Sequence, residues 1–270
     1  MLPPRGGRPA GTIPSMQPHI VLLGTGTCQL QERRMASSVL VELPDLRFVF
    51  DFGRGIALRL VQQGLRQDEV EHVVLSHFHP DHLSDLIPYL HAACWSQVDP
   101  RHRDLHIYGP PGLEVQLMRL LSLFGPHDLS RPEHFRVHLH EIHDSCFAIG
   151  RHRLEVADLP PAGNRGIKLQ LGDLSCALTG DSGFHTQEIE FLRDVDLAVI
   201  DAGHLSDDEI VDLAAGTQVR TLVCSHLYRE LDAAELQTRA GARGYRGRLL
   251  VGEDGMVLPA AARGVCMPAG

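Results

Sequence analysis

Four side chains that can bind metal ions occur within six residues, where the sequence reads His-Phe-His-Pro-Asp-His from position 77 to 82. Alternate residues of an extended chain point to the same side, so His77 and His79 can hold one ion together. The proline then ends the extended run, and Asp81 and His82 can point at a second ion nearby. Two ions that share one water lower its pKa, so this spacing favours hydrolytic chemistry.

The residues around this motif predict the elements that position it. An apolar run at residues 72–75 predicts a strand that stops at the motif. Apolar residues at positions 83, 86, 87 and 90 follow at helical spacing and predict one amphipathic helix that starts within the motif. A strand before and a helix after form the context that a metal-binding motif needs, whereas a histidine-rich polar loop is the alternative.

With this motif, the chain resembles the metallo-β-lactamase-like hydrolases, which carry the pattern HxHxDH, and the resemblance runs from about residue 19 to residue 258. The resemblance implies an α/β fold, a four-layer αββα sandwich, with the active cleft where the strands stop. Strand-like and helical runs alternate along the chain in agreement with this architecture. Four further segments match the family in order, each at the end of an apolar run: residues 22–27 (LLGTGT), 48–53 (FVFDFG), 178–182 (LTGDS) and 222–226 (LVCSH).

The resemblance also implies a set of metal ligands. Asp181, in the LTGDS segment, would bridge the two metals, and His226 would complete the second site. Two divalent metal ions are therefore the implied cofactor, zinc in the first place, with manganese or iron as alternatives. The full set of ligands is His77, His79, Asp81, His82, Asp181 and His226.

A finer resemblance concerns residues 201–209, which read Asp-Ala-Gly-His-Leu-Ser-Asp-Asp-Glu. The segment looks like one in ribonuclease Z and its small phosphodiesterase relatives, which implies that His204 protonates the leaving oxygen as general acid. Asp81 would then hold the metal-bound hydroxide that attacks phosphorus. The structural alternative is that His204 only precedes a helix whose N-cap is Ser206.

One departure from the family's pattern concerns the first metal site. Family members carry a further histidine there, and aligning Gly166 with the family's next strand puts Pro160 or Pro161 at its position. A proline side chain cannot bind metal. Three outcomes stay open: the first ion keeps its remaining ligands, Asp158 supplies an oxygen ligand suited to a harder ion, or only the second site binds metal tightly. Histidines that could fold back as the absent ligand are His127, His134, His138, His140, His143 and His152.

These residues favour a metal-dependent hydrolase of the phosphodiesterase type, acting on a small cyclic phosphodiester or nucleotide. The formal net charge of −9 disfavours nucleic acid as a partner, because non-specific affinity for it comes mainly from phosphate neutralisation. Two alternatives are a hydrolase of a lactone, thioester or other carbonyl substrate, and a non-catalytic biosynthetic accessory protein of the same fold. Loop residues that could line a small-molecule pocket are Arg33, Arg34, Trp95, His185 and Tyr228.

Length and composition bound the organisation of the chain. In 270 residues we expect one domain at residues 18–258, a disordered leader at residues 1–17 and a flexible tail at residues 259–270. Six scattered cysteines without CxxC spacing, and no secretory segment, favour reduced thiols and the cytoplasm. No run is long and apolar enough for a membrane span. If the chain oligomerises, we expect a homodimer.

Overall fold

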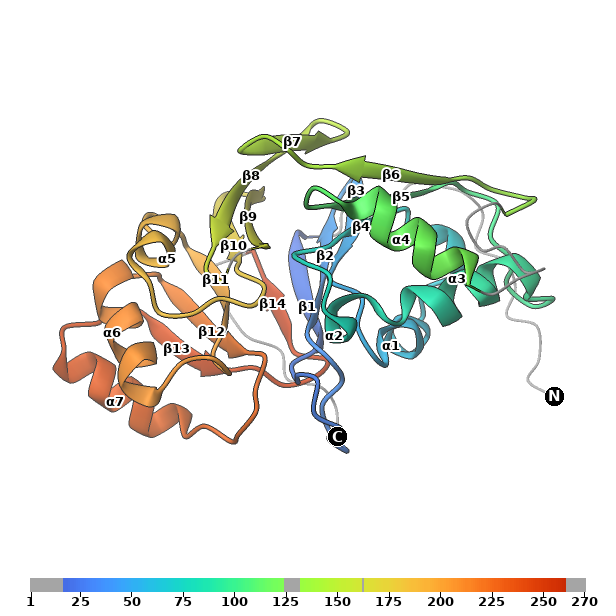
Figure 1. Cartoon of the computed structure of the whole chain (residues 1–270). Coiled ribbons are helices and arrows are strands. Elements are labelled where there is room, and N and C mark those ends of the chain that lie inside the picture. Colours follow the sequence, from blue (N-terminus) through green and yellow to red (C-terminus); the bar gives the residue numbers. More distant parts are fainter. Residues whose placement is uncertain (1–16, 124–131, 162, 261–270) are drawn as a thin grey trace.

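Two β-sheets pack face to face in the computed structural model, which describes residues 17–123, 132–161 and 163–260. Each sheet has seven strands. One group of helices covers the outer face of each sheet, so the layers run helices, sheet, sheet, helices (Figure 1). The predicted four-layer αββα sandwich is therefore confirmed.

The first sheet contains β1 (His19–Gly24), β2 (Ser38–Leu43), β3 (Leu46–Phe50), β4 (His72–Val74), β5 (Leu105–Gly109), β6 (Val137–Glu141) and β14 (Val257–Pro259). Their order across the sheet is β14-β1-β2-β3-β4-β5-β6, and β3 to β6 run parallel to one another. The helices on this side are α1 (Ile56–Gln62), α2 (Pro80–Leu83), α3 (Leu86–Trp95) and α4 (Leu113–Ser122), with a short 3-10 helix at Gln67–Glu69.

The second sheet contains β7 (Cys146–Ile149), β8 (His152–Leu159), β9 (Asn164–Leu171), β10 (Leu174–Leu178), β11 (Leu197–Asp201), β12 (Thr221–Ser225) and β13 (Arg248–Val251). Its order is β13-β12-β11-β10-β9-β8-β7, and β10 to β13 run parallel. The helices on this side are α5 (Thr186–Phe191), α6 (Asp207–Thr217) and α7 (Ala233–Ala242).

Apolar side chains fill all three spaces between the four layers. Along β1, Ile20 and Leu22 pack between the two sheets, while Val21 and Leu23 pack under the helices of the first sheet. The strand is apolar throughout because both of its faces are covered. A third cluster lies between the second sheet and its helices. Polar side chains are consequently displaced to the points where the buried strands end.

The observed elements follow the predicted ones closely, with three differences. The single helix predicted after the metal-binding motif is two helices, α2 and α3, because the N–H of Asp85 donates to the carbonyl of Phe52 (3.1 Å) rather than to a helical carbonyl. The short edge strands β7 and β14 were not predicted. The predicted tail begins too early, because Pro259 is the last residue of β14.

The predicted leader lies outside the described residues except for Gln17, and so does the predicted tail beyond residue 260. Both therefore stay predictions. Within the described part of the chain, no helix has the length and apolar composition needed to cross a membrane.

Candidate metal centre

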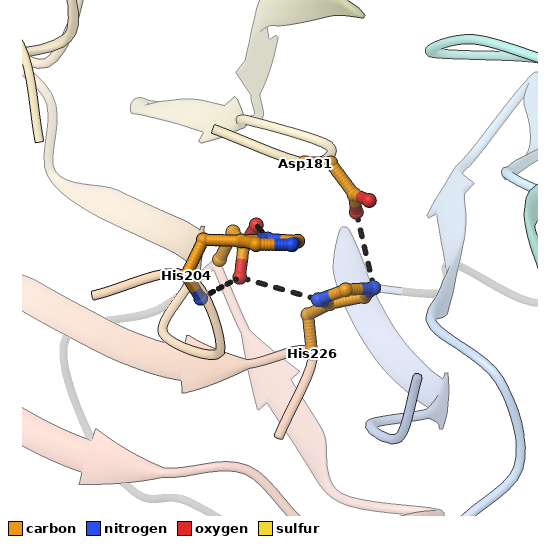
Figure 2. Close-up of side chains that lie close together, drawn as sticks. Asp181, His204 and His226 are labelled. Atoms are coloured by element: carbon orange, nitrogen blue, oxygen red, sulfur yellow. Dashed lines mark hydrogen bonds and ion pairs between the residues drawn. The ribbon is translucent and has the colours of Figure 1, made fainter. Parts of the chain in front are cut away.

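The polar segments of the two sheets meet at one end of the sandwich. The segment 77–82 follows β4, Asp181 follows β10, and His226 follows β12. Because these strands belong to the parallel parts of their sheets, their carboxyl ends lie at a common edge. Figure 2 shows Asp181 and the rings of His204 and His226 gathered there, on chain segments that leave different strands. The structure thus brings together side chains that are far apart in the sequence.

Asp181 lies between two groups of histidines. Its Oδ2 is 3.6 Å from His77 Nε2 and 4.0 Å from His79 Nδ1. Its Oδ1 is 2.9 Å from His82 Nε2 and 3.1 Å from His226 Nε2. One carboxylate oxygen therefore faces each group, which is the arrangement of a carboxylate that bridges two cations.

We call His77 and His79 the His79 side of this cluster, and Asp81, His82 and His226 the His226 side. The ligand atoms of the His79 side and Asp181 lie within 4.8 Å of one another, as do those of the three residues of the His226 side. Asp81 Oδ2 is 3.6 Å from His226 Nε2. All six predicted ligands are thus in one cluster.

Glycine allows the chain to place Asp181 at this point. Gly180 has a backbone φ of 67°, which residues with a Cβ rarely adopt. A Cβ there would come within 2.4 Å of Asn164 Oδ1 and 2.6 Å of Ser76 Cβ. The chain can therefore turn sharply after β10 only because residue 180 has no side chain. This turn brings Asp181 against the segment that follows β4.

Several buried polar atoms in the cluster have no hydrogen-bond partner. Around Asp181 these atoms are its own Oδ1 and the Nε2 atoms of His77, His82 and His226. Leaving a buried polar atom unpaired costs about 1–3 kcal/mol. A cation on each side of Asp181 would satisfy them, and imidazole with carboxylate is a donor set that suits zinc, manganese or iron. The residues present therefore fit two divalent metal ions.

A buried aspartate fixes the orientation of two of these rings. His82 Nδ1 donates to Asp51 Oδ2 (2.8 Å), which leaves Nε2 directed at Asp181. The Ser76 hydroxyl also donates to Asp51 Oδ2 (2.8 Å), so its oxygen can accept from His77 Nδ1 (2.9 Å). Such carboxylates behind a histidine set its tautomer and raise its affinity for metal. The sequence interpretation missed this role of Asp51, although its place at the end of an apolar run was a signal for it.

The charges around the two sides shift the histidine pKa values in opposite directions. Burial, and then the neighbouring His82, lowers the pKa of His77 to about 4, so its lone pair is available at neutral pH. Burial also acts to lower the pKa of His82, but Asp51 and Asp181 outweigh it and raise that pKa well above the ordinary value. The His226 side therefore has an excess of negative charge that favours a bound cation.

A second buried aspartate, Asp201, supports the rings of His226 and His204. Its Oδ1 is 3.2 Å from His226 Nδ1, and its Oδ2 is 2.6 Å from His204 Nδ1. The backbone N–H groups of Ser182 and Gly203 donate to the same carboxylate (3.0 and 2.8 Å). The rings of His204 and His226 stack with their centroids 5.3 Å apart. Asp201 was not a predicted site residue, although it begins the segment 201–209 on which the finer resemblance rests and lies at the end of a strand.

His204 is more exposed than its neighbour His226. Its side chain is 44% exposed, whereas that of His226 is 2% exposed. The hydrogen bond with Asp201 raises the pKa of His204 above its ordinary value. Ser206 does cap α6, as the structural alternative predicted, and forms a capping box with Glu209. The cap at Ser206 is therefore compatible with the position of His204 beside the cluster.

The segment expected to carry a further ligand contacts the Asp181 loop through the backbone of Pro160. The carbonyl of Pro160 accepts from the N–H of Gly183 (3.0 Å), beside the Asp181 loop. The Asp158 side chain is 76% exposed and forms an ion pair with Arg165 (2.9 Å). It belongs to none of the candidate metal-binding groups in the described residues, so the structure does not support it as the replacement ligand.

The other candidate histidines are also elsewhere. Among the described residues, none of those predicted to fold back is part of the candidate metal-binding groups, and His127 lies outside the described residues. The histidines placed elsewhere are His134, His138, His140, His143 and His152.

Of the residues expected to line a small-molecule pocket, Tyr228 contacts rings at the cluster. Its ring meets those of His204 and His226 edge on, with centroids 5.6 and 5.5 Å apart. The Arg34 guanidinium instead binds the Thr25 hydroxyl and the carbonyl of residue 252 (both 2.7 Å). The sequence alone could not separate these two, because both occur in loops.

Comparison with known proteins gives one family for most of the chain. Residues 32–226 match the model of the Metallo-beta-lactamase superfamily. A protein named Ribonuclease Z from Mycobacterium sp. (strain KMS) is 30% identical over 239 residues, which cover 82% of this chain and 80% of that protein.

Solved structures show the same fold at lower identity. The metallo-beta-lactamase fold protein YhfI from Bacillus subtilis has a TM-score of 0.73 at 18% identity, over 90% of this chain and 99% of that one. A diphosphatase from the PhnP family has a TM-score of 0.64 at 16% identity, over 93% of this chain and 100% of that one. Both are similar to this chain in architecture.

Proposed function

The chain belongs to the metallo-beta-lactamase superfamily and is a metallo-hydrolase, and from this premise we propose that it hydrolyses small phosphodiesters, such as a cyclic phosphodiester or a nucleotide. The observation that carries the proposal is the position of His204. Its partly exposed ring stacks on His226 near Asp181 and is held by Asp201. A phosphodiester needs such a proton donor, because its leaving alkoxide is a poor leaving group until it is protonated.

Divalent metal ions bound by the two sides and Asp181 would supply Lewis-acid activation of a phosphoryl oxygen and a water of lowered pKa. The chain's own residues supply the proton transfer. Because Asp201 accepts from His204 Nδ1 and raises the pKa of that ring, His204 carries a second proton on Nε2 over a wider range of pH. Nε2 is then the atom that donates to the leaving oxygen. Asp81, whose pKa is lowered by His226 and His82 against the effect of burial, stays anionic and orients the incoming water.

RNA is a second candidate substrate, and the observation that favours it is the relationship to proteins named Ribonuclease Z. Those relatives do not support the prediction that nucleic acid is disfavoured, because RNA is cleaved by a phosphodiester reaction as well. The net charge of −9 still weakens the attraction of a long polyanion. We therefore place small phosphodiesters first and RNA second.

A substrate panel tests this proposal. Purified protein is assayed with a cyclic nucleotide, an aryl phosphodiester, an RNA with an extended end and a thioester, with and without His204→Ala. We expect turnover of the small phosphodiesters to exceed that of the RNA. His204→Ala should lower kcat for the cyclic nucleotide by roughly 100- to 10,000-fold, and should lower it less for the aryl phosphodiester, because a phenolate leaves more readily than an alkoxide.

His152→Ala is the matched control, because His152 is paired with Asp45 outside the cluster and should leave kcat unchanged. Turnover of the thioester alone would refute the phosphodiesterase assignment in favour of carbonyl chemistry. Bound metal without turnover of any substrate would favour the accessory protein, and unchanged kcat in His204→Ala would refute the role of His204.

A further inference from the structure

A row of histidines crosses the first sheet away from the candidate centre. His72 pairs with His106 across β4 and β5, and His106 pairs with His138 across β5 and β6. His140 follows two residues later on β6, on the same face as His138. His72 begins β4, whereas the candidate centre lies beyond the end of that strand. The four histidines form what we call the histidine row (His72, His106, His138 and His140).

Two rings of the histidine row face each other through their nitrogens. His106 Nδ1 is 3.0 Å from His140 Nε2, and the two ring planes are inclined by only 18°. Two imidazole ligands of one tetrahedral ion, each with a bond of about 2.0–2.1 Å, have nitrogens about 3.3 Å apart. A shift of a few tenths of an ångström, with a turn of the rings toward the ion and transfer of the shared proton to the other nitrogen of its ring, would turn this hydrogen-bonded pair into a pair of ligands.

The surroundings of the pair favour binding of a cation. Burial is the main cause that lowers the pKa of His106 and His140, so both rings are neutral at neutral pH and each has a lone pair. His138 Nε2 donates to Asp104 Oδ2 (2.8 Å), the kind of carboxylate contact that lies behind metal-bound histidines. The His140 ring is held in place by Tyr108, which stacks on it at 4.5 Å.

The histidine row can be reached from solvent at the edge of the sheet. β6 is the last strand of the first sheet, and His106, His138 and His140 are all partly exposed. His138 stacks on His106 with centroids 4.6 Å apart, so it supports that ring as Tyr108 supports the ring of His140. In the structure only two nitrogens of the row face each other, so the site would bind more weakly than the candidate centre.

We infer that the histidine row is a second, independent metal site, which binds a transition metal ion through His106 and His140 at the edge of the first sheet. The donors are imidazole nitrogens, which suit zinc, nickel or copper rather than magnesium or calcium. The inference does not depend on the proposed phosphodiesterase activity, because no residue of the row belongs to the candidate centre.

Titration with nickel(II) tests the inference. The protein is first saturated with zinc and freed of excess, and nickel(II) binding is then measured by calorimetry in a non-chelating buffer near neutral pH. We expect one further ion per chain in the wild type, and at least a tenfold loss of affinity in His106→Ala and in His140→Ala. His143→Ala is the matched control, because His143 is an exposed histidine close to the row that pairs with Glu141.

A second variant separates loss of a ligand from loss of structure. His140→Phe keeps an aromatic ring against Tyr108 but has no nitrogen, so it should fold like the wild type and fail to bind the additional ion. Nickel(II) should raise the Tm of the wild type and of His143→Ala, but not that of His140→Phe. No additional ion in the wild type, or an additional ion retained by both His106→Ala and His140→Phe, would overturn the inference.

Discussion

The two sides of Asp181 differ in how firmly their ligands are held. On the His226 side, His82 is fully buried and His226 is 2% exposed, and the second nitrogen of each ring lies against a buried aspartate, Asp51 or Asp201. On the His79 side, His79 is 66% exposed. Pro160, at the position where a further ligand was expected, contacts the Asp181 loop through its carbonyl, and its side chain cannot bind metal.

This difference suggests that the two sides have separate tasks. Ligands whose orientation is fixed by buried carboxylates lose little freedom when they bind an ion, and such supporting contacts are worth roughly 10- to 100-fold in affinity. We therefore propose that the His226 side would hold an ion more tightly than the His79 side. The more exposed His79 side would leave positions for water and substrate, which a catalytic site needs.

The most damaging change should be one that affects both sides. We expect Asp181→Asn to weaken both, because the amide carries no charge and only one of its two terminal atoms can bind a cation. A loss of several kcal/mol of Lewis-acid stabilisation corresponds to roughly a thousandfold lower kcat. Elemental mass spectrometry should find less metal per chain together with the lower kcat. Asp158→Asn, an exposed change outside the cluster, should alter neither.

Removing one ligand at a time should distinguish the metal binding of the two sides. We expect His226→Ala to leave the protein with less metal after dialysis than His79→Ala, because His226 belongs to the preorganised side. His79→Ala should lower kcat while one ion is retained. The measurement is metal per chain during a stepwise titration with a chelator. Equal loss of metal in the two variants would break the comparison, because it would mean that the ions bind and leave together.

Substitution of a side chain that supports a ligand should have a smaller effect on metal binding than loss of the ligand itself. Asp51→Asn should weaken metal binding on the His226 side by roughly 10- to 100-fold, because the ring of His82 loses its charged partner. Ser76→Ala removes the hydroxyl that His77 contacts and should cost less, because the partner lost is neutral. Competition with a fluorescent chelator measures both. A larger loss of metal affinity in Ser76→Ala than in Asp51→Asn would mean that the His79 side depends more on its supporting contacts than the His226 side does.

The sequence was sufficient for features that depend on local spacing. The positions of His77, His79, Asp81 and His82 follow from one strand and one turn, so their convergence could be predicted from the motif. The fold and the strand ends were predictable for a similar reason, because apolar runs of strand length alternate with helical ones.

Features that depend on register between distant segments could not be predicted. The facing of His106 and His140 arises from the pairing of β5 with β6, about thirty residues apart in the chain. Asp158 was a reasonable ligand by position, but pairing of β8 with β9 puts it beside Arg165 instead. Asp51 and Asp201 act through buried contacts that no motif spacing specifies.

Among these substitutions, replacement of Glu188 should have the smallest effect on metal content and kcat. Glu188 lies behind the His226 side. The Ser182 hydroxyl donates to Glu188 Oε1 (2.7 Å), and the N–H of Ser182 donates to Asp201. Burial is the main cause that raises the pKa of Glu188 from its ordinary 4.5 to about 8, and the charge of Asp201 adds to it. The folded state therefore binds this proton more tightly than the unfolded chain does.

It follows that the stabilising effect of this proton is complete below the unfolded pKa and is lost as pH rises from about 4.5 to about 8. Glu188→Gln keeps an acceptor for Ser182 but cannot ionise. We expect its free energy of unfolding to fall less than that of the wild type over this range, with a difference of a few kcal/mol at most. Urea unfolding at several pH values measures this, and kcat and metal content should change by less than about twofold. Parallel pH profiles of the two proteins would show that Glu188 ionises normally, and a large loss of metal would show that the support of the His226 side extends beyond Asp201.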